Sequence, residues 1–219
     1  MTGRVIECPL DEMALRSLFR FAKRRGLAFA DPTRHLRGGR GAGRTVLPMT
    51  AGEIRAVEQA AVTPAQRLAI ALAAVHAARP KAIRELTLDD IDLPSRRITI
   101  DGHRQRLGEL TRNALLAWLG YRRATWPDTA NRHVLLSRIS ALGTGPVSPD
   151  YLDKHQLRGV SLEHIRRDRI LHEALATGAD PLHLTLVFNI DHTNAMAYAN
   201  VARNLLTSPA EQALSRRWE

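Results

Sequence analysis

Glu163-His164-Ile165-Arg166-Arg167 and the later Asn194-Ala195-Met196-Ala197-Tyr198 are the most informative stretches of this chain. Each stretch lies in a predicted helix. His164 and Arg167 are three residues apart, so they share one face of their helix. Tyr198 follows Arg167 by 31 positions and belongs to another predicted helix. The chain therefore presents a histidine, an arginine and a late tyrosine, in that order, as candidate functional side chains.

The composition favours a polyanionic partner. The 219 residues include 32 Lys and Arg against 22 Asp and Glu, a net charge of +10, and the pI is about 11.0. Nucleic acid is the leading candidate for a chain this basic. An acidic membrane surface is a weaker candidate, because no strongly basic amphipathic helix with large apolar residues stands out. A soluble, arginine-rich protein without an anionic partner is the remaining alternative.

Cysteine usage and hydropathy point to a cytoplasmic protein with no membrane span. Cys8 is the only cysteine, so the chain forms no internal disulfide and no cysteine zinc cluster, as expected in a reducing cytoplasm. The longest apolar run, Leu68–Ala78, has 11 residues and is too short to cross a bilayer. No basic region followed by an apolar stretch opens the chain, so we expect no signal peptide.

The N-terminal part predicts a small helical segment and a linker. Residues 11–25 have an amphipathic helical pattern that ends at Gly26. The following stretch, residues 37–46, is rich in glycine and contains Arg37, Arg40 and Arg44. Such a composition predicts a flexible basic linker and a domain boundary. A surface loop within one domain is the alternative.

Helix signals dominate the rest of the chain. Capping boxes begin at Thr50 and Thr63, and Pro64 suits the first position of a central apolar helix that runs to about Ala77. A short helix follows from Pro80 to Leu86. Further helices are expected over Thr111–Arg123 and after Ser148, Ser161, Asp180 and Ser208, with Gly178 as a helix stop.

Two stretches have the character of strands. Arg97–Ile100, the dipeptide Asp101-Gly102 and a second short extended run predict a β-hairpin. Val134–Leu136 is interpreted as a buried strand. The predicted fold is therefore mostly α with a small antiparallel β-sheet.

The candidate side chains suit phosphate chemistry. Arg79 and Arg167 could each donate two parallel hydrogen bonds to a phosphate, and His164 could share that contact or shuttle a proton. A tyrosine hydroxyl such as that of Tyr198 becomes a nucleophile when cationic neighbours favour its phenolate. The alternative role for Arg79 is stabilisation of a helix end alone, and Arg166 or Arg169 is the alternative to Arg167. No His, Asp or Glu arrangement has metal-ligand spacing.

The order and spacing of these residues resemble the tyrosine recombinase (phage integrase) family over roughly Leu47–Leu206. The first family arginine, upstream of an Asp-Ile-Asp-like turn, matches Arg79 ahead of Asp90-Ile91-Asp92. The family's His-x-x-Arg matches His164 to Arg167, eleven residues before Gly178. Its late tyrosine matches Tyr198.

Two positions depart from the family pattern. His103 follows the hairpin turn where the family has a lysine, and Ile190 occupies a position where the family has a phosphate-binding histidine or tryptophan. Ile190 cannot hydrogen-bond a phosphate. Histidine changes charge near neutral pH, so the protonation of His103 depends on pH.

The resemblance implies a domain organisation and an activity. It implies a remnant of a helical core-binding domain in residues 1–36, the linker in residues 37–46 and a catalytic domain in residues 47–219. In such a site-specific recombinase or integrase, Tyr198 attacks the scissile phosphate and forms a 3′-phosphotyrosine link. Arg79, His164 and Arg167 hold the phosphate, and His103 protonates the leaving 5′ oxygen.

The resemblance also implies the partners. The substrate is double-stranded DNA, and neither a metal nor a cofactor is required, since the covalent link conserves the bond energy. Family members act as DNA-bound tetramers that exchange C-terminal segments, and the predicted helix Pro209–Trp218 is the candidate for that contact.

Other hypotheses remain open on the sequence alone. The changes at His103 and Ile190 favour a DNA-binding protein on the recombinase scaffold that no longer cuts. A helical protein unrelated to DNA, with accidental motif matches, is the third hypothesis. If Tyr198 is not the nucleophile, Tyr121 and Tyr151 are the remaining tyrosines.

Overall fold

The computed structural model describes residues 19, 21, 23–26, 47–154 and 161–215, and in residues 153–154 and 208–215 it describes the backbone alone. The chain divides into two compact units, Met1–Thr45 and Val46–Glu219. Most of the predicted helix over residues 11–25 lies outside the described residues. So do the linker and its arginines Arg37, Arg40 and Arg44. The interpretation of residues 1–36 as a core-binding remnant stays a prediction.

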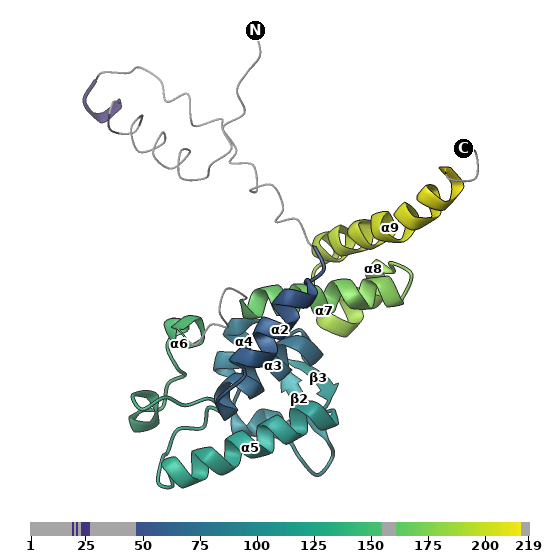
Figure 1. Cartoon of the computed structure of the whole chain (residues 1–219). Coiled ribbons are helices and arrows are strands. Elements are labelled where there is room, and N and C mark those ends of the chain that lie inside the picture. The colour runs from purple at the N-terminus through teal and green to yellow at the C-terminus, as the bar shows by residue number, and fades with distance from the viewer. Residues whose placement is uncertain (1–18, 20, 22, 27–46, 155–160, 216–219) are drawn as a thin grey trace. The chain divides into compact units, whose positions relative to one another are not determined.

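The second unit is mostly helical, with one small sheet (Figure 1). Its α-helices are α2 (Ala51–Ala60), α3 (Pro64–His76), α4 (Pro80–Glu85), α5 (Glu109–Thr125), α6 (Pro149–Lys154), α7 (Leu162–Ala176), α8 (Pro181–Phe188) and α9 (His192–Ser215). Two 3-10 helices, η2 (Leu88–Asp90) and η3 (Ser140–Leu142), lie between them. Among the described residues, no helix is both long and apolar enough to span a membrane.

The sheet contains the predicted hairpin. Strands β1 (Ile91–Asp92), β2 (Arg97–Ile100) and β3 (His103–Arg106) are antiparallel and lie in the order β1-β2-β3. Asp101 and Gly102 connect β2 to β3 with φ angles of 52° and 75°. Positive φ at both central residues is typical of the tight type I′ turn that matches strand twist. The prediction of a mostly α fold with a small antiparallel sheet is confirmed.

Helix α3 forms the centre of the larger hydrophobic core. It packs against α5 and α7, and Leu68 and Leu72 on it are 0% and 1% exposed (Figure 1). Its capping box and first-position proline suit the predicted helix start. From α5, Leu115 and Trp118 join the same core, and the Trp118 indole donates to the Val134 carbonyl at 2.7 Å. The packing of α3 therefore fixes the position of its last turn and of the junction between α3 and α4.

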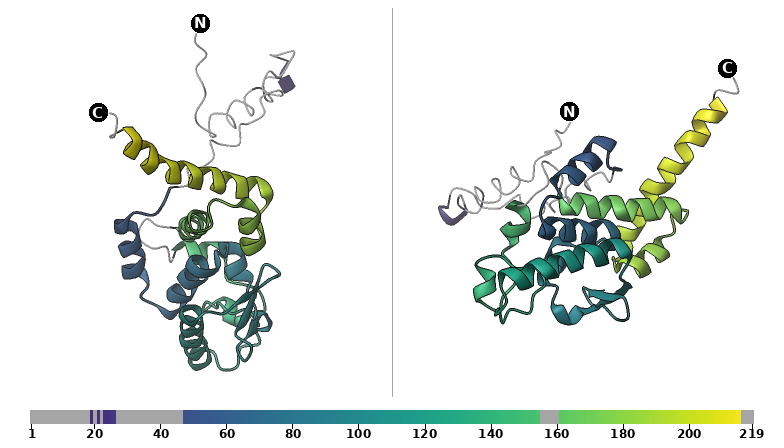
Figure 2. Two further views of the ribbon diagram at one scale, coloured as in Figure 1. Left: turned by 90° about the vertical axis from the view of Figure 1, so that its right-hand side faces the viewer. Right: turned by 60° about the horizontal axis from the view of Figure 1, so that its bottom comes forward.

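A second, smaller cluster joins α7, α8 and α9. It includes Ile170 from α7, Leu184 from α8, and Tyr198 and Ala199 from α9. Glu173 on α7 pairs with His183 on α8 at 2.9 Å, which fastens these two helices. In both views of Figure 2 the C-terminal part of α9 extends away from α7 and α8.

Two predicted elements differ from the structure. Val134–Leu136 is buried as predicted but forms no strand; its neighbour His133 makes a single bridge to Thr87. Burial here comes from packing under α5, which an apolar run alone does not distinguish from a strand. The helix start predicted at Ser208 is wrong, because α9 continues through Pro209. Proline removes one backbone donor from a helix and usually ends it, but here the helix continues.

The end of α3 has an unusual backbone. Ala77 caps α3 in the left-handed conformation, with φ 50° and ψ 34°, and its side chain is buried. The Ala78 amide donates to the Leu72 carbonyl, which closes the helix end. Glycine usually occupies this left-handed position, because a Cβ atom there crowds the backbone. The sharp turn directs the chain from α3 into Arg79 and α4.

We expect Ala77→Gly to be tolerated or stabilising. Relief of about 1–2 kcal/mol of left-handed strain should offset the greater chain entropy of glycine and the loss of one buried methyl. Ala73→Gly, at a fully buried site inside α3, should lower the free energy of unfolding by about 1–2 kcal/mol. Urea unfolding of both variants measures the contrast, and equal losses would show that Ala77 stores no strain.

Candidate functional site

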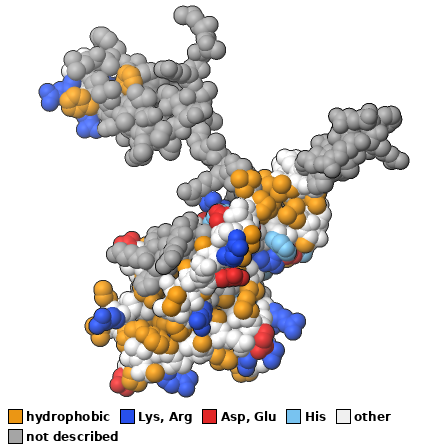
Figure 3. Space-filling model, in the orientation of Figure 1, with side chains coloured by type: hydrophobic (Ala, Val, Ile, Leu, Met, Phe, Trp, Pro, Cys, Tyr) orange, Lys and Arg blue, Asp and Glu red, His pale blue; other side chains and the backbone are white. Residues whose placement is uncertain are grey.

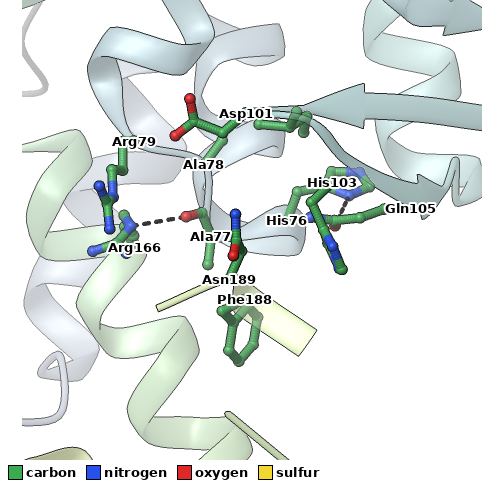
Figure 4. Close-up of a pocket in the computed structure, with 11 residues that line it drawn as sticks. His76, Ala77, Ala78, Arg79, Asp101, His103, Gln105, Arg166, Phe188 and Asn189 are labelled. Atoms are coloured by element: carbon green, nitrogen blue, oxygen red, sulfur yellow. Dashed lines mark hydrogen bonds between the residues drawn. The ribbon is translucent and has the colours of Figure 1, made fainter. Parts of the chain in front are cut away.

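A small polar pocket lies where the end of α3 meets the hairpin and the C-terminal helices (Figure 4). Its lining comes from the α3–α4 junction, the hairpin, α7 and the end of α8. The lining residues are His76, Ala77, Ala78, Arg79, Ile100, Asp101, His103, Gln105, Arg166, Phe188 and Asn189. Four segments that are distant in the sequence therefore meet at one place.

Arg166 is the buried cation of the pocket. Its side chain is 8% exposed, its Nε donates to the Ala77 carbonyl at 2.9 Å, and its Nη1 donates to Glu163 at 3.2 Å. The left-handed Ala77 thus directs its carbonyl to a guanidinium that lies 89 residues later in the chain. In Figure 4 the side chains of Arg166 and Arg79 lie beside each other.

Arg79 and His103 also line the pocket, Arg79 beside Arg166 and His103 across from them (Figure 4). Arg79 is the exposed N-cap residue of α4, directly after the turn at the end of α3. His103 begins β3, and it faces the pocket together with Gln105, two residues along the same strand. Alternate residues of a strand share a face, so the hairpin presents His103 and Gln105 together. The pocket therefore contains two of the five catalytic residues predicted from the sequence.

Arg166, and not Arg167, is the arginine of α7 that lines the pocket. The Arg167 side chain is 24% exposed, and its Nε lies 3.5 Å from Glu163. The sequence offered two adjacent arginines, and only packing distinguishes them. The apolar spacing does not separate them, because Arg166 precedes the buried Ile170 by four residues and Arg167 precedes the buried Leu171 by four.

His164 also lies outside the pocket lining. Its Nδ1 is 3.8 Å from Glu53 on α2, and its side chain is 33% exposed. With Arg166 as the pocket arginine, the residue three positions earlier is Glu163 rather than a histidine. Glu163 contacts both Arg166 and Arg167, so one carboxylate offsets part of the charge of two guanidiniums.

Tyr198 lies next to the pocket but does not line it. It is 7% exposed and belongs to the same buried cluster as Ala77 and Phe188, both of which line the pocket. Burial raises the pKa of the Tyr198 hydroxyl, and the neighbouring charges of Arg166 and Arg167 oppose that rise. In this conformation the hydroxyl is protonated at neutral pH. Its environment contains the cations that would stabilise a phenolate.

A buried histidine that the sequence did not single out supports the hairpin. His76, in the last turn of α3, joins Gln105 through Nδ1 at 2.8 Å and Thr111 through Nε2 at 3.1 Å. Its side chain is nearly inaccessible, and burial lowers the pKa of the imidazole. His76 is therefore neutral at pH 7 and holds Gln105 at the pocket wall (Figure 4). The cue in the sequence was its place inside the apolar run of α3.

Asn189 is the second pocket residue that sequence reasoning missed. It ends α8 in the left-handed conformation, φ 48°, and its side chain lines the pocket. Asparagine tolerates this conformation better than most residues. Ile190, expected at a phosphate-binding position, is instead 3% exposed in the smaller core. A polar amide is thus available beside the apolar residue.

The arrangement suits an anionic oxygen ligand. Two guanidiniums, two imidazoles and two amides line the pocket together with Asp101. Guanidinium groups bind phosphate with paired, charge-assisted hydrogen bonds. No group of three or more His, Cys, Asp or Glu side chains in the described part of the chain is arranged to hold a metal ion.

The fold is similar to those of solved recombinase and integrase structures. The chain aligns with XerA recombinase over 90% of its length and 74% of that protein, with a TM-score of 0.60 and 14% identity. It aligns with Tn1549 transposon integrase in complex with transposon right end DNA over 95% of its length and 89% of that chain, with a TM-score of 0.55 and 14% identity. It aligns with a lambda integrase dimer bound to a COC′ core site over 87% of its length and 71% of that chain, with a TM-score of 0.51 and 17% identity.

Sequence comparison adds no relatives. No model of a protein family matches the sequence, and no curated protein matches it. The structural likeness shows that the chain has the fold of tyrosine-recombinase catalytic domains. At this identity the likeness concerns the fold alone.

The buried His76 predicts a pH-dependent stability. Its pKa is lower in the folded state than in the unfolded chain, so its contribution is complete above the ordinary histidine value of about 6.5 and is lost as pH falls below it. Between pH 7.5 and 5.5 the free energy of unfolding should fall by at most about 1.4 kcal/mol through this group.

His76→Gln should remove this pH-dependent part, since glutamine does not titrate. His172→Gln, at an exposed site on α7, is the matched control and should keep the wild-type difference. Urea unfolding at the two pH values provides the measurement. A His76→Gln variant with the wild-type pH difference would contradict a buried neutral His76.

Proposed function

We propose that this protein is a site-specific DNA recombinase or integrase that cleaves and rejoins DNA through a 3′-phosphotyrosine intermediate. The observation that carries the proposal is the pairing of Arg79 and Arg166 in one pocket, with Tyr198 within electrostatic reach of Arg166. The fold is that of enzymes whose chemistry this arrangement suits.

Each side chain has a role in the proposed step. The Tyr198 oxygen bonds to the scissile phosphorus as its phenolic proton passes to solvent water, and the bond from phosphorus to the 5′ oxygen breaks. Arg79 and Arg166 bind the non-bridging oxygens, where negative charge develops. His103, as imidazolium, gives its proton to the leaving 5′ oxygen. A 5′ hydroxyl from a second strand then reverses the step and restores tyrosine.

The proposed roles revise the sequence-based assignment. Arg166 takes the place of Arg167 because it is the arginine at the pocket. Asn189 is proposed as a neutral phosphate ligand where Ile190 cannot serve. His164, paired with Glu53 on α2, has no assigned role in this step.

Tyr198 must move for the reaction to proceed. Its ring is buried against α7 and α8, whereas a nucleophile has to reach the phosphorus. We propose that DNA binding and assembly shift α9 so that the hydroxyl enters the pocket. The C-terminal part of α9, which extends away from α7 and α8, is proposed to contact a second protomer in a DNA-bound homo-oligomer (Figure 2).

The electrostatic attraction for DNA is proposed to come mainly from the N-terminal segment. Residues 1–45 contain ten Lys and Arg against four Asp and Glu, which leaves 22 against 18 in residues 46–219. Arg37, Arg40 and Arg44 are proposed to follow the phosphate backbone. A DNA substrate and the single cysteine favour the cytoplasm as the place of action.

A second candidate function is DNA binding without cleavage. The specific observation in its favour is Glu163, whose carboxylate engages the pocket arginine at 3.2 Å and competes with a phosphate for it. The raised pKa of the buried Tyr198 also opposes phenolate formation. Covalent attachment to DNA distinguishes the two functions.

Tyr198→Phe should abolish covalent attachment while folding and DNA affinity persist. The variant removes one hydroxyl and keeps the buried ring. The assay uses a pool of nicked duplexes with randomised flanks, on which a cutter becomes trapped as a protein–DNA adduct visible in a denaturing gel. Tyr121→Phe, at a partly exposed site on α5, is the matched control and should leave the adduct yield unchanged.

The outcomes of this assay are distinct. An adduct with wild type and Tyr121→Phe, absent with Tyr198→Phe, supports the recombinase. DNA binding by wild type without any adduct supports the second candidate function. An adduct that persists in Tyr198→Phe would show that Tyr198 is not the nucleophile. Sequencing the DNA-linked peptide then tests Tyr121 and Tyr151.

Arg166→Gln and Arg167→Gln separate the two neighbouring arginines. Arg166→Gln should lower the rate of adduct formation by at least about a hundredfold, as expected for loss of a preorganised donor at a developing charge. Arg167→Gln should lower it by less than about tenfold, because its guanidinium lies outside the pocket lining. Circular dichroism checks folding. The reverse order of effects would restore the assignment of Arg167.

A further inference from the structure

The hairpin has two faces of different character. Ile98 and Ile100 on β2, with Gln105 and His103 opposite them on β3, face the core and the pocket. The alternate residues therefore lie on the outer face. These residues are Arg97, Thr99, Arg104 and Arg106, and all three arginines are exposed.

Two arginines oppose each other across the strands. In the register of β2 and β3, Arg97 is paired directly with Arg106. Like charges placed directly opposite on antiparallel strands destabilise the pair. Arg104 lies on the same face, and its guanidinium reaches Asp92 on β1 at 3.4 Å.

Neutralisation on this face is incomplete. Asp92 is its one strand carboxylate, and the amide and hydroxyl of Ser95 also engage it. Within the described part of the chain, neither Arg97 nor Arg106 forms an ion pair or a side-chain hydrogen bond. Figure 3 shows Lys and Arg side chains, with acidic ones between them, along the edge that the hairpin forms in Figure 1. One carboxylate, Asp92, lies opposite Arg97 and pairs with Arg104, so it offsets only part of the charge of three guanidiniums and the face keeps a net positive charge for an external anion.

We propose that the outer face of the hairpin, formed by Arg97, Arg104 and Arg106, is a second contact site for the phosphate backbone of duplex DNA. This inference rests on the proposed function, which supplies DNA as the ligand. The site is separate from the pocket because the two use opposite faces of the same strands. Its contacts position the hairpin, and with it His103, relative to the duplex.

Charge and spacing favour a phosphate backbone over other anions. Arg97 and Arg106 are adjacent across the strands, and Arg104 lies two residues along β3 from Arg106. A row of guanidiniums suits the repeated charges of a nucleic-acid strand, whereas a single small anion would engage one or two of them. The flanking Arg96 and Arg112 share Glu109, so part of the charge on the neighbouring surface is offset. The hairpin brings three arginines together on one face with a single strand carboxylate, Asp92.

The test is the salt dependence of duplex binding by the full chain. Each phosphate contact contributes about −0.9 to the slope of log K against log salt. Arg97→Gln combined with Arg106→Gln should reduce the magnitude of that slope by about 2. Arg123→Gln combined with Arg138→Gln is the matched control, because both arginines are exposed and neither forms an ion pair within the described residues. The control slope should equal that of wild type.

A stability measurement guards against misfolding. Removing the opposed charges at Arg97 and Arg106 should leave the melting temperature unchanged or slightly higher, since the repulsion between them is lost. A folded double variant with the wild-type slope would overturn the inference while adduct formation leaves the proposed function intact. Equal slope losses in the hairpin variant and the control would also overturn it. Wild type that binds no duplex DNA would instead overturn the proposed function.

Discussion

The hydrogen bond from the buried Arg166 guanidinium to the Ala77 carbonyl determines the geometry of the whole site. A guanidinium taken out of water is costly unless its donors are matched, and here one backbone carbonyl and the Glu163 carboxylate receive them. That carbonyl points at Arg166 only because Ala77 adopts a left-handed conformation. The same turn ends α3 shortly before Arg79 and places Arg79 beside Arg166. One strained residue thereby brings together two arginines that lie far apart in the sequence.

The hairpin is held to the same point by a second polar connection. His76 precedes Ala77 at the end of α3 and bonds Gln105 on β3, while its other nitrogen meets Thr111 on α5. Because the imidazole is buried and neutral at pH 7, it supports the strand without adding charge to the pocket. The end of α3 thus positions both the arginine pair and the strand that presents His103. Loss of its packing would displace the entire site.

Charge is distributed unevenly between the two parts of the chain. The second unit is close to balanced, and much of the basic excess lies in residues 1–45. A nearly neutral body leaves local groups, such as the pocket arginines and the outer face of the hairpin, as the specific cationic features of its surface. In the proposed function, long-range attraction to a polyanion and local phosphate binding are therefore assigned to different segments. The buried position of Tyr198 adds a further requirement to that proposal, because its hydroxyl would reach the pocket only after a movement of α9.

Much of the fold was predictable because local signals decide it. The capping boxes at Thr50 and Thr63, Pro64 and the Asp101-Gly102 turn act through neighbouring atoms, so their structures follow from short stretches of sequence. The predictions of a strand at Val134–Leu136 and of a helix start at Ser208 and Pro209 were wrong. There, packing under α5 and the continuation of α9 outweigh local preference.

The candidate site was predictable only in part. The sequence by itself determined the helical class, the hairpin, the turns that Arg79 and His103 follow, and the basic charge of the chain. Only the tertiary structure placed Arg166 rather than Arg167 in the pocket lining, brought Asn189 and His76 there, and buried Ile190. Adjacent helix residues differ by about 100° in direction, and the sequence does not reveal which of two arginines meets a carbonyl 89 residues away. Long-range packing supplies that direction.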